Sequence, residues 1–370
     1  MATETQINAK KFKNDEFYTQ FNDVLREINS YLEFNKDVFK GKTVLLPCDD
    51  PEWSNFTKYF AQNFQVLGLK KLISTSYAPN SKPREIDYQP SLFEIESPLF
   101  DETKTHENGK IFTLTEDKTG DGVINVEDLE WSYLEGDGDF RSDEICKLRD
   151  EADIIITNPP FSLFREFLAW VVEAEKDFVI IGNKNSITYK EVFPLIKENK
   201  MWLGGTPMSA DLLFHLPIST AEDFVANKKE GSAWKMVDGV VMGRASGIWF
   251  SSLDHGRRHE PLQLMTIADN IKFNKHIGKA GYQRYDNYDA IEVPFTDAIP
   301  SDFDGVMGVP ISFLGKYNPD QFEILGLGAS AGYDPDIVGL PFLGEKDARP
   351  LIQGKNTYAR IFLRHKKVNK

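Results

Sequence analysis

The chain has 370 residues, of which 41% are hydrophobic and 12% aromatic, so it can bury a large core and is not a disordered protein. Its only cysteines are Cys48 and Cys146, which excludes a disulfide scaffold and a four-cysteine zinc site. No apolar run reaches the roughly 18 residues that a membrane helix needs, and residues 1–13 lack the apolar segment of a secretory signal, so we expect a cytoplasmic protein with no membrane partner.

The formal net charge of −14 is unevenly distributed. Residues 84–151 hold 7 basic and 20 acidic side chains, whereas residues 255–370 hold 15 basic and 14 acidic ones. Because nucleic-acid phosphates are bound by Lys and Arg, only the C-terminal third has the composition for a local basic face. The candidate phosphate ligands there are Arg257, Arg258, Lys272, Lys275 and Arg284.

Hydrophobic periodicity predicts strands that alternate with helices. In chain order, we expect a helix at 16–39, a strand at 43–47, a helix at 54–64, strands at 72–77 and 152–157, a helix at 162–174, a strand at 178–182, a helix at 188–197 and strands at 201–204 and 248–251. Such alternation is typical of a parallel sheet covered by helices on both faces. We therefore predict a doubly wound, Rossmann-like α/β fold, in which ligands bind beyond the carboxyl ends of the strands.

Residues 79–135 interrupt this pattern, since they are acidic and contain four prolines. An excursion of this length in a compact domain is usually an insertion or a functional loop. After residue 254 the composition becomes balanced in charge. We predict one domain over residues 10–254, carrying an acidic insertion at 79–135, and a second region over residues 255–370.

The most informative motif is Asn158-Pro159-Pro160-Phe161, which follows the apolar run 152–157. A residue that precedes proline is disfavoured in the helical region, so Asn158 and Pro159 are held extended. The two prolines have no N–H and present carbonyls without competing donors. Such a turn can accept two hydrogen bonds from a planar amino group, and its aromatic side chain can stack on the ring that carries this group. Methylation of an exocyclic amine on a base requires both contacts. The alternative is an ordinary proline-rich exit from a strand.

This motif and its surroundings resemble the EcoRI-type adenine-specific (N6) DNA methyltransferase family. The segments 15–20, 48–51, 136–142 and 158–166 occur in the family's order, and 285–290, 307–310 and 318–323 also fit. The resemblance therefore extends from about residue 10 to about residue 326. Each motif alone is weakly specific, whereas the ordered set is highly specific.

The resemblance implies that S-adenosylmethionine is the cofactor. It assigns cofactor binding to Phe17, Tyr18, Thr19, Pro47, Cys48, Asp49, Asp50, Asp139, Phe140 and Asn158. Residues 17–19 would close over the methionine end, the carboxylates at 49 and 50 suit the ribose diol or the amino-acid end, and Asp139 with Phe140 suits the adenine. The alternatives are ordinary acidic turns at 48–51 and 136–139, and a buried helix position for Phe17.

The resemblance assigns catalysis to Asn158, Pro159, Pro160 and Phe161. The Asn158 side-chain oxygen and the Pro159 carbonyl would hold the adenine amine while Phe161 stacks the base, so that orientation and electrostatics promote transfer. The implied partner is double-stranded DNA, from which the target adenine is flipped out. Residues 10–254 would be the methyltransferase domain and residues 255–370 the target-recognition region. The family also allows for a cognate restriction endonuclease that acts on the same site without direct contact.

Other interpretations remain open from the sequence. The same catalytic motif serves RNA adenine methylation, a relative of it serves protein glutamine methylation, and the fold could belong to a catalytically silent DNA-binding protein. Residues 117–128 resemble a calcium loop, although Thr119 and Asp128 stand where stronger ligands are usual, and a hairpin fits the segment as well. His255 and His259 have metal-ligand spacing but no evident third ligand, so a solvated basic loop is preferred.

Overall fold

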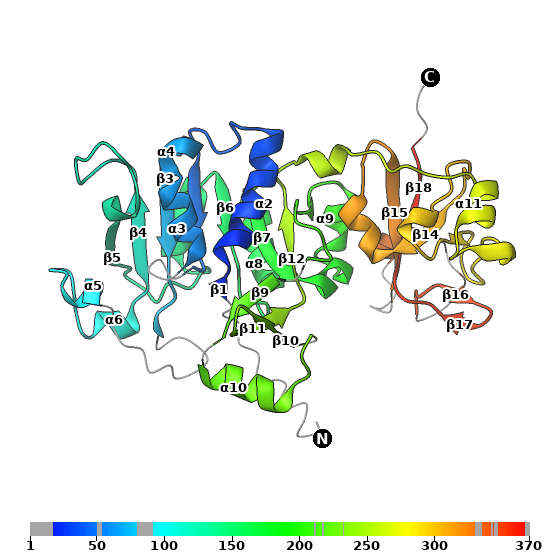
Figure 1. The fold of residues 1–370 in the computed structure, drawn as a ribbon. Coiled ribbons are helices and arrows are strands. Elements are labelled where there is room, and N and C mark those ends of the chain that lie inside the picture. Colours follow the sequence, from blue (N-terminus) through cyan, green and yellow to red (C-terminus); the bar gives the residue numbers. More distant parts are fainter. Residues whose placement is uncertain are drawn as a thin grey trace. The chain divides into compact units, whose positions relative to one another are not determined.

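The structure, a computed structural model, describes residues 18–49, 54–79, 92–210, 212–216, 218–231, 233–329, 335–341, 343 and 347–366. The chain divides into two compact units (Figure 1). Unit 1 comprises Met1–Asn183 and Ala210–Leu253, and unit 2 comprises Lys184–Ser209 and Asp254–Lys370. Among the described residues, no helix combines the length and apolar composition needed to cross a membrane.

The centre of unit 1 is a mixed sheet with the strand order β5-β4-β3-β2-β6-β7-β12. Its four inner strands are parallel: β2 (Thr43–Leu46), β3 (Lys71–Thr75), β6 (Ile154–Thr157) and β7 (Asp177–Asn183). The flanking strands are antiparallel to their neighbours: β4 (Lys110–Leu114), β5 (Glu130–Tyr133) and β12 (Gly247–Ser251). The predicted parallel sheet is therefore correct for the inner strands and wrong for the flanking strands, which pair antiparallel after long connections.

Helices cover both faces of this sheet. Neighbouring side chains of a strand point to opposite faces of the sheet. On β12, the ring centroid of Trp249 lies 5.9 Å from that of Phe56, and the ring centroid of Phe250 lies 5.5 Å from that of Phe164. These partners belong to α3 (Asn55–Gln62) and α8 (Phe164–Glu173), so the two helices lie on opposite faces. The two-sided cover explains why β2 and β6 are buried along their whole length.

The remaining helices of unit 1 follow the apolar pattern of the sequence. In α2 (Phe21–Phe34), Val24, Ile28 and Tyr31 are fully buried at helical spacing. The others are α4 (Phe64–Leu67), α5 (Leu92–Ile95), α6 (Lys104–Glu107), η2 (Val126–Asp128) and α7 (Asp143–Glu151). The described residues 92–135 of the acidic insertion thus form part of the sheet edge, since they contain α5, α6, β4, η2 and β5.

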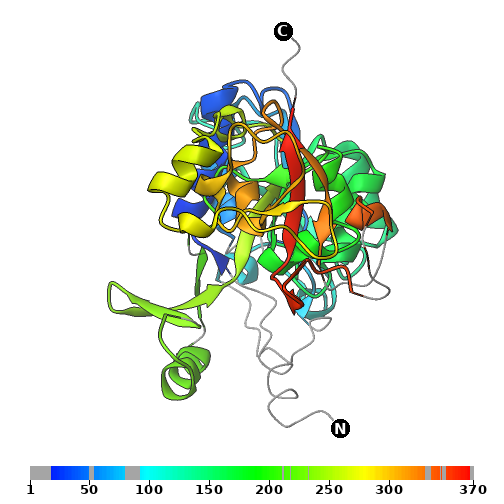
Figure 2. The ribbon, with the colours of Figure 1, turned by 90° about the vertical axis from the view of Figure 1, so that its right-hand side faces the viewer.

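A second sheet in unit 1 joins the start of the described chain to the segment near residue 240. It has the order β1-β9-β11-β10, all antiparallel, with β1 (Tyr18–Thr19), β9 (Leu212–His215), β10 (Trp234–Val237) and β11 (Val240–Ala245). Figure 2 shows the β10–β11 hairpin and α10 (Ile218–Asn227) projecting from the rest of their unit.

Unit 2 is built on the sheet β13-β14-β18-β15, with β13 (Ile291–Glu292), β14 (Met307–Pro310), β15 (Phe322–Gly328) and β18 (Arg360–His365). Its helical elements are η3 (Lys184–Thr188), α9 (Phe193–Lys197), η4 (Gly256–His259), α11 (Ile267–Phe273), η5 (Gly278–Ala280), η6 (Thr296–Ala298), η7 (Ile311–Lys316) and α12 (Pro335–Val338). The short strands β8 (Trp202–Leu203), β16 (Leu351–Ile352) and β17 (Lys355–Asn356) complete it.

Candidate active site

Loops that carry predicted site residues lie at one edge of the central sheet. Because β3, β2 and β6 are parallel neighbours, the loops that follow them leave the sheet at the same edge. These loops contain Pro47, Cys48 and Asp49 after β2, residues 76–78 after β3, and the Asn158-Pro159-Pro160-Phe161 motif after β6. The fold thereby brings together segments that lie more than a hundred positions apart in the sequence.

Asp49 connects two of these loops. One carboxylate oxygen, Oδ1, accepts a 2.9 Å hydrogen bond from the Ser54 hydroxyl, and Oδ2 accepts a 2.5 Å bond from the Thr157 hydroxyl. The backbone carbonyl of Asp49 also accepts a 3.3 Å bond from Ser74 of β3. All four side chains are buried. Asp49 therefore fixes the loop after β2 against β3 and against the residue that precedes Asn158, and its oxygens can accept further bonds.

The loop that carries Asp139 is held at the end of β3. The carbonyl of Asp137 accepts a 2.7 Å bond from the Ala78 N–H, and Gly138, at φ +83°, lies so close that a Cβ on it would fall 2.1 Å from the Ser76 carbonyl oxygen. Only glycine fits this contact without displacing the loop. Asp139 is thus brought to the same edge of the sheet as Asp49.

The Asp139 carboxylate is paired with Arg141. The Arg141 Nε donates to Oδ1 at 2.9 Å and Nη2 to Oδ2 at 2.6 Å, and these hydrogen bonds hold the pKa of Asp139 below its usual value. The Phe140 ring is buried against Phe167 and Trp170 of α8, with centroids 5.2 and 5.6 Å away. The expected stacking of Phe140 on an adenine stays a prediction.

The catalytic motif forms a turn between β6 and α8. The Pro160 carbonyl accepts a 2.9 Å bond from the Leu163 N–H at the start of the helix. Over the part of the chain that the structure describes, no donor reaches the Pro159 carbonyl. Phe161 is half-buried against the core, and a Cβ on Gly247 of β12 would fall 3.6 Å from its ring. The turn thus engages the Pro160 carbonyl and leaves that of Pro159 without a described backbone donor.

Thr19 joins the N-terminal motif to the same site. Its carbonyl accepts a 2.7 Å bond from the Asn55 side chain, and Asn55 directly follows Ser54, the residue that holds Asp49. The Thr19 hydroxyl is buried, yet it has no hydrogen-bond partner among the described residues. An unsatisfied buried hydroxyl is unfavourable, so this atom suits a ligand that supplies the partner. Phe17 and Asp50 lie outside the described residues.

Ser54, Asn55 and Thr157 belong to the same hydrogen-bonded network, although no sequence motif singled them out. Ser54 is the N-cap of α3 and accepts a 3.1 Å bond from the Phe56 N–H, which is a role that a serine before a helical pattern signals. Thr157 ends a strand and precedes Asn158, so its position was visible in the sequence. What the sequence could not show is that its hydroxyl meets Asp49, 108 positions away.

The family of the chain follows from comparisons with known proteins. The model of the family described as "Adenine-specific methyltransferase EcoRI" matches residues 6–366. The chain belongs to this family. Its membership confirms the family predicted from the motifs and makes the chain an adenine-specific DNA methyltransferase.

Individual relatives cover nearly the same length. The type II methyltransferase M.EcoRI of Escherichia coli is 40% identical over 367 residues, which is 98% of this chain and 96% of the relative. The type II methyltransferase M.MpnI of Mycoplasma pneumoniae is 33% identical over 86% of this chain and 83% of its own length. The type II methyltransferase M.MgeORF184P of Mycoplasma genitalium is 31% identical over 97% of this chain and 98% of its own length. No solved structure matches the chain.

Hydrogen bonds from backbone N–H groups to two carboxylates organise the calcium-like loop of residues 117–128. In the calcium-like loop, the Asp128 carboxylate accepts backbone N–H bonds of 2.9 Å from Lys118, Thr119 and Asn125, and these bonds lower its pKa. Asp117 likewise accepts bonds of 2.6 and 2.7 Å from Gly120 and Gly122. Among the described residues, no group of three or more His, Cys, Asp or Glu is placed to hold a metal.

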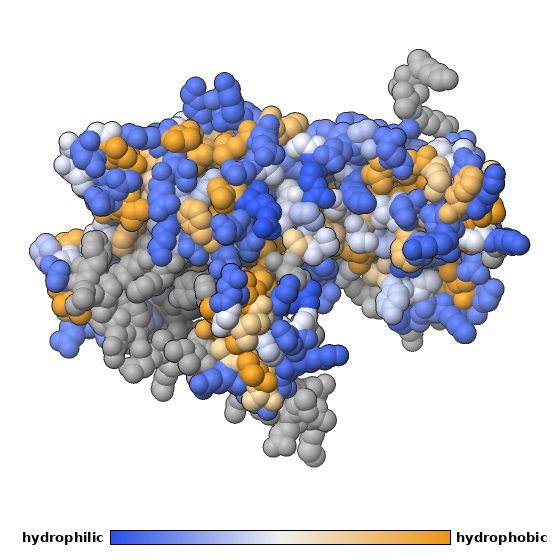
Figure 3. Space-filling model, viewed as in Figure 1, coloured by the Kyte–Doolittle hydropathy of each residue, from blue (hydrophilic) through white to orange (hydrophobic). Residues whose placement is uncertain are grey.

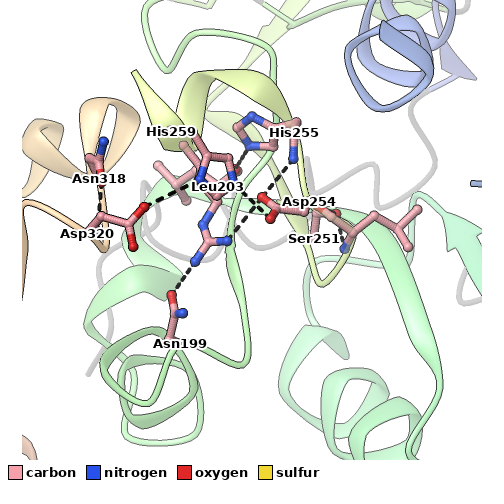
Figure 4. Close-up of polar contacts among 10 residues, drawn as sticks. Asn199, Leu203, Ser251, Asp254, His255, His259, Asn318 and Asp320 are labelled. Carbon is pink, nitrogen blue, oxygen red and sulfur yellow. Dashed lines mark hydrogen bonds and ion pairs between the residues drawn. The ribbon is translucent and has the colours of Figure 1, made fainter. Parts of the chain in front are cut away.

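In unit 2, the two histidines of the basic loop point to different partners (Figure 4). The His255 Nε2 lies 2.9 Å from the Leu203 carbonyl, whereas the His259 Nε2 lies 2.8 Å from Asp254. Arg258 is buried, pairs with Asp254 at 3.1 Å, and stacks 3.7 Å over Trp202. The prediction that Arg258 contacts DNA is therefore wrong, because its guanidinium is committed to the core of unit 2. Arg257 also donates to protein carbonyls, those of Gly205 and Gly315.

Proposed function

We propose that the enzyme transfers a methyl group from S-adenosylmethionine to N6 of an adenine flipped out of duplex DNA. The observation that carries the proposal is the hydrogen bond from Thr157 to Asp49, which couples the loop after β2 to Asn158. A cofactor loop and a substrate-binding motif must be held in one geometry for methyl transfer, and this contact provides the link.

The residues at the sheet edge fit the cofactor. S-adenosylmethionine supplies a methyl group already activated by its sulfonium charge. We propose that the buried Thr19 hydroxyl, the loop Pro47–Cys48–Asp49 and the carboxylate of Asp139 hold it, with Phe17, Tyr18, Asp50 and Phe140 as further candidates. Asp139 would exchange part of its Arg141 pairing for a hydrogen bond to an exocyclic amine, as a half-exposed arginine permits.

The catalytic motif supplies acceptors and a ring. The Asn158 side-chain oxygen and the Pro159 carbonyl accept the two N–H groups of the target amine, which orients its lone pair. Phe161 packs against the base that carries the amine, while Pro160 is engaged with the start of α8 and keeps the turn stiff. Positive charge that develops on the amine nitrogen lies against these oxygens, so preorganised electrostatics lowers the barrier.

The base must leave the duplex to reach this turn, at a cost of roughly a few kcal/mol in stacking and pairing. We assign this task to contacts outside the methyltransferase domain of residues 10–254, in the target-recognition region of residues 255–370. Since the relatives are type II enzymes of bacteria, we also propose a cytoplasmic location and a cognate restriction endonuclease that acts on the same site without direct contact.

Tritiated methyl transfer to duplex DNA and to RNA tests this proposal. We expect label in duplex DNA, located at adenine N6 of one short sequence when DNA from cells that express the protein is sequenced with modified-base detection. Label in RNA alone would identify an RNA methyltransferase. Binding of duplex DNA without any transfer, at saturating cofactor, would identify a silent DNA-binding relative.

A further inference from the structure

Unit 2 carries an exposed surface on which lysines alternate with apolar and aromatic side chains. It lies on α11 and the turn that follows, and we define it as the α11 face: Ile271, Lys272, Phe273, Lys275, His276 and Lys279, all exposed. Residues 267–284 contain four Lys or Arg and one Asp, in a chain whose net charge is −14. Figure 3 shows hydrophobic and hydrophilic residues side by side at the end of the unit that carries α11.

Buried asparagines turn this face outward. Asn270 is fully buried and donates a 3.2 Å bond to the Met265 carbonyl, and Asn274 is buried and donates a 3.3 Å bond to the Asn270 side chain. The side-chain oxygen of Asn274 also accepts a 3.0 Å bond from the His276 N–H. Because positions 270, 274 and 277 face the core, the lysines between them are held on the surface.

The lysines of the α11 face are not neutralised. The acidic residue of the helix, Asp269, is engaged at the first turn, where it accepts a 2.8 Å bond from the Thr266 hydroxyl. Across the described residues, no carboxylate lies within ion-pair distance of Lys272, Lys275 or Lys279. Three cations without counter-charges, on one short segment, attract a polyanion.

The aromatic residues of this surface are unusually exposed. Phe273 is 65% exposed, with the Lys272 ammonium 4.8 Å from its ring centroid. Beside the α11 face, Phe295 is 45% exposed and its ring stacks on His276, with centroids 3.8 Å apart. Exposed rings next to free cations fit a ligand that offers both phosphates and stacking bases.

We propose that the α11 face binds the DNA substrate, with Lys272, Lys275 and Lys279 on backbone phosphates and Phe273 against the bases. The proposal rests on the proposed function and names the surface of unit 2 that binds the duplex. Phosphate contacts fix the register of a protein on DNA, and an apolar side chain pressed between or onto bases favours the unstacking that flipping requires. Arg284 is less suited, because its guanidinium pairs with Asp289.

Salt-dependent binding of the full-length protein to a duplex oligonucleotide that the wild type methylates tests the phosphate contacts. The triple variant K272A/K275A/K279A should reduce the log–log salt slope by about 2.7, since each lost phosphate contact contributes about 0.9. The matched control K36A/K40A/K70A removes the same charge from exposed positions before β2 and β3, at the opposite edge of the sheet from the catalytic motif, and should leave the slope unchanged.

Phe273→Ala should weaken duplex binding roughly 10-fold without changing the salt slope, and Phe273→Trp should restore it, because stacking depends on the ring and not on charge. Cofactor affinity, measured in each variant, reports that unit 1 is intact. An unchanged slope in the lysine variant, with wild-type methylation of duplex DNA, would overturn this surface alone. A change in oligomeric state without a change in DNA binding would make the face a protein interface. Failure of the wild type to bind duplex DNA would overturn both proposals.

Discussion

The hydroxyl of Thr157 donates a 2.5 Å hydrogen bond to Oδ2 of Asp49. Thr157 is the last residue of β6 and Asp49 follows β2, so the bond ties two strand ends in the middle of the sheet. The other oxygen of Asp49 is held by Ser54, the cap of α3. One buried carboxylate thus positions the loop after β2, the start of α3 and the residue before Asn158.

Thr157→Val should lower methyl transfer while the protein still folds. The variant keeps the shape of threonine but leaves a buried carboxylate without one of its donors. A hydrogen bond to a charged group is worth about 1.5–3 kcal/mol, so we expect a loss in kcat/KM of roughly 10- to 150-fold. Thr157→Ser retains the hydroxyl and serves as the control. Equal activity of the valine and serine variants would show that the bond does not position the site.

Much of this site could be predicted from the sequence, because its residues stand at the ends of apolar runs. The runs at 43–47 and 152–157 identify β2 and β6, and the carboxyl ends of parallel strands share one edge. The inner sheet was predictable for the same reason. The direction of β12 was not, because an apolar run reads the same in a parallel and an antiparallel strand.

Contacts over long distances in sequence were beyond prediction. Arg258 stands in a basic run that reads as solvated, yet its guanidinium packs on Trp202 inside unit 2. The acidic insertion reads as a loop, yet a buried pair between Glu94 and Lys110, 2.6 Å apart, helps to fold it onto the sheet. Periodicity reports which face of an element is apolar and not which polar groups will meet.

Asn158→Ala should abolish most catalysis and leave cofactor binding largely intact. We propose that the side chain of Asn158 holds the target amine, and removal of one preorganised group of this kind costs roughly 10²-fold or more in rate. Single-turnover methyl transfer measures the chemical step, and calorimetry measures the cofactor affinity. Activity within a few-fold of wild type would remove Asn158 from the catalytic group.

Thr19→Val should weaken cofactor binding without destabilising the free protein. The Thr19 hydroxyl has no partner among the described residues, so replacing it by a methyl group removes a buried unsatisfied group. If the cofactor satisfies this hydroxyl, its loss costs a typical hydrogen bond of about 0.5–1.5 kcal/mol, or roughly a 2- to 12-fold higher Kd. Thermal unfolding without cofactor should show an equal or higher Tm. A lower Tm with an unchanged Kd would assign Thr19 a structural role.

Asp139→Ala should raise the cofactor Kd more than it slows transfer at saturating cofactor. The loop that carries Asp139 packs at the end of β3. The Asp139 carboxylate pairs with the Arg141 side chain, and an exocyclic amine of the cofactor could replace part of that pairing. The matched control is Asp143→Ala, an exposed aspartate at the start of α7. Calorimetry that gives the same Kd for the wild type and for Asp139→Ala would remove Asp139 from the cofactor site.

The pairing of Asp139 with Arg141 should make a pH-dependent contribution to stability. Hydrogen bonds from Arg141 lower the pKa of Asp139 in the folded protein, so the stabilisation is complete above the unfolded value of about 3.9 and is lost as the pH falls through the folded value. Because Arg141 is half-exposed, we expect Arg141→Gln to cost at most about 1 kcal/mol near pH 7.

Denaturant unfolding of the wild type and of Arg141→Gln between pH 7 and pH 3 measures this contribution. The difference in the free energy of unfolding should be constant near neutral pH, shrink below about pH 4 and fall when salt is added. Arg141 also lies 3.1 Å from Glu166, so Glu166→Gln separates that exposed pair from the Asp139 pair. In an Asp139→Asn background, the effect of Arg141→Gln on the free energy of unfolding should lose most of its pH dependence. A difference that persists unchanged to pH 3 would show that Arg141 stabilises the loop by packing on Phe140 and not through the carboxylate.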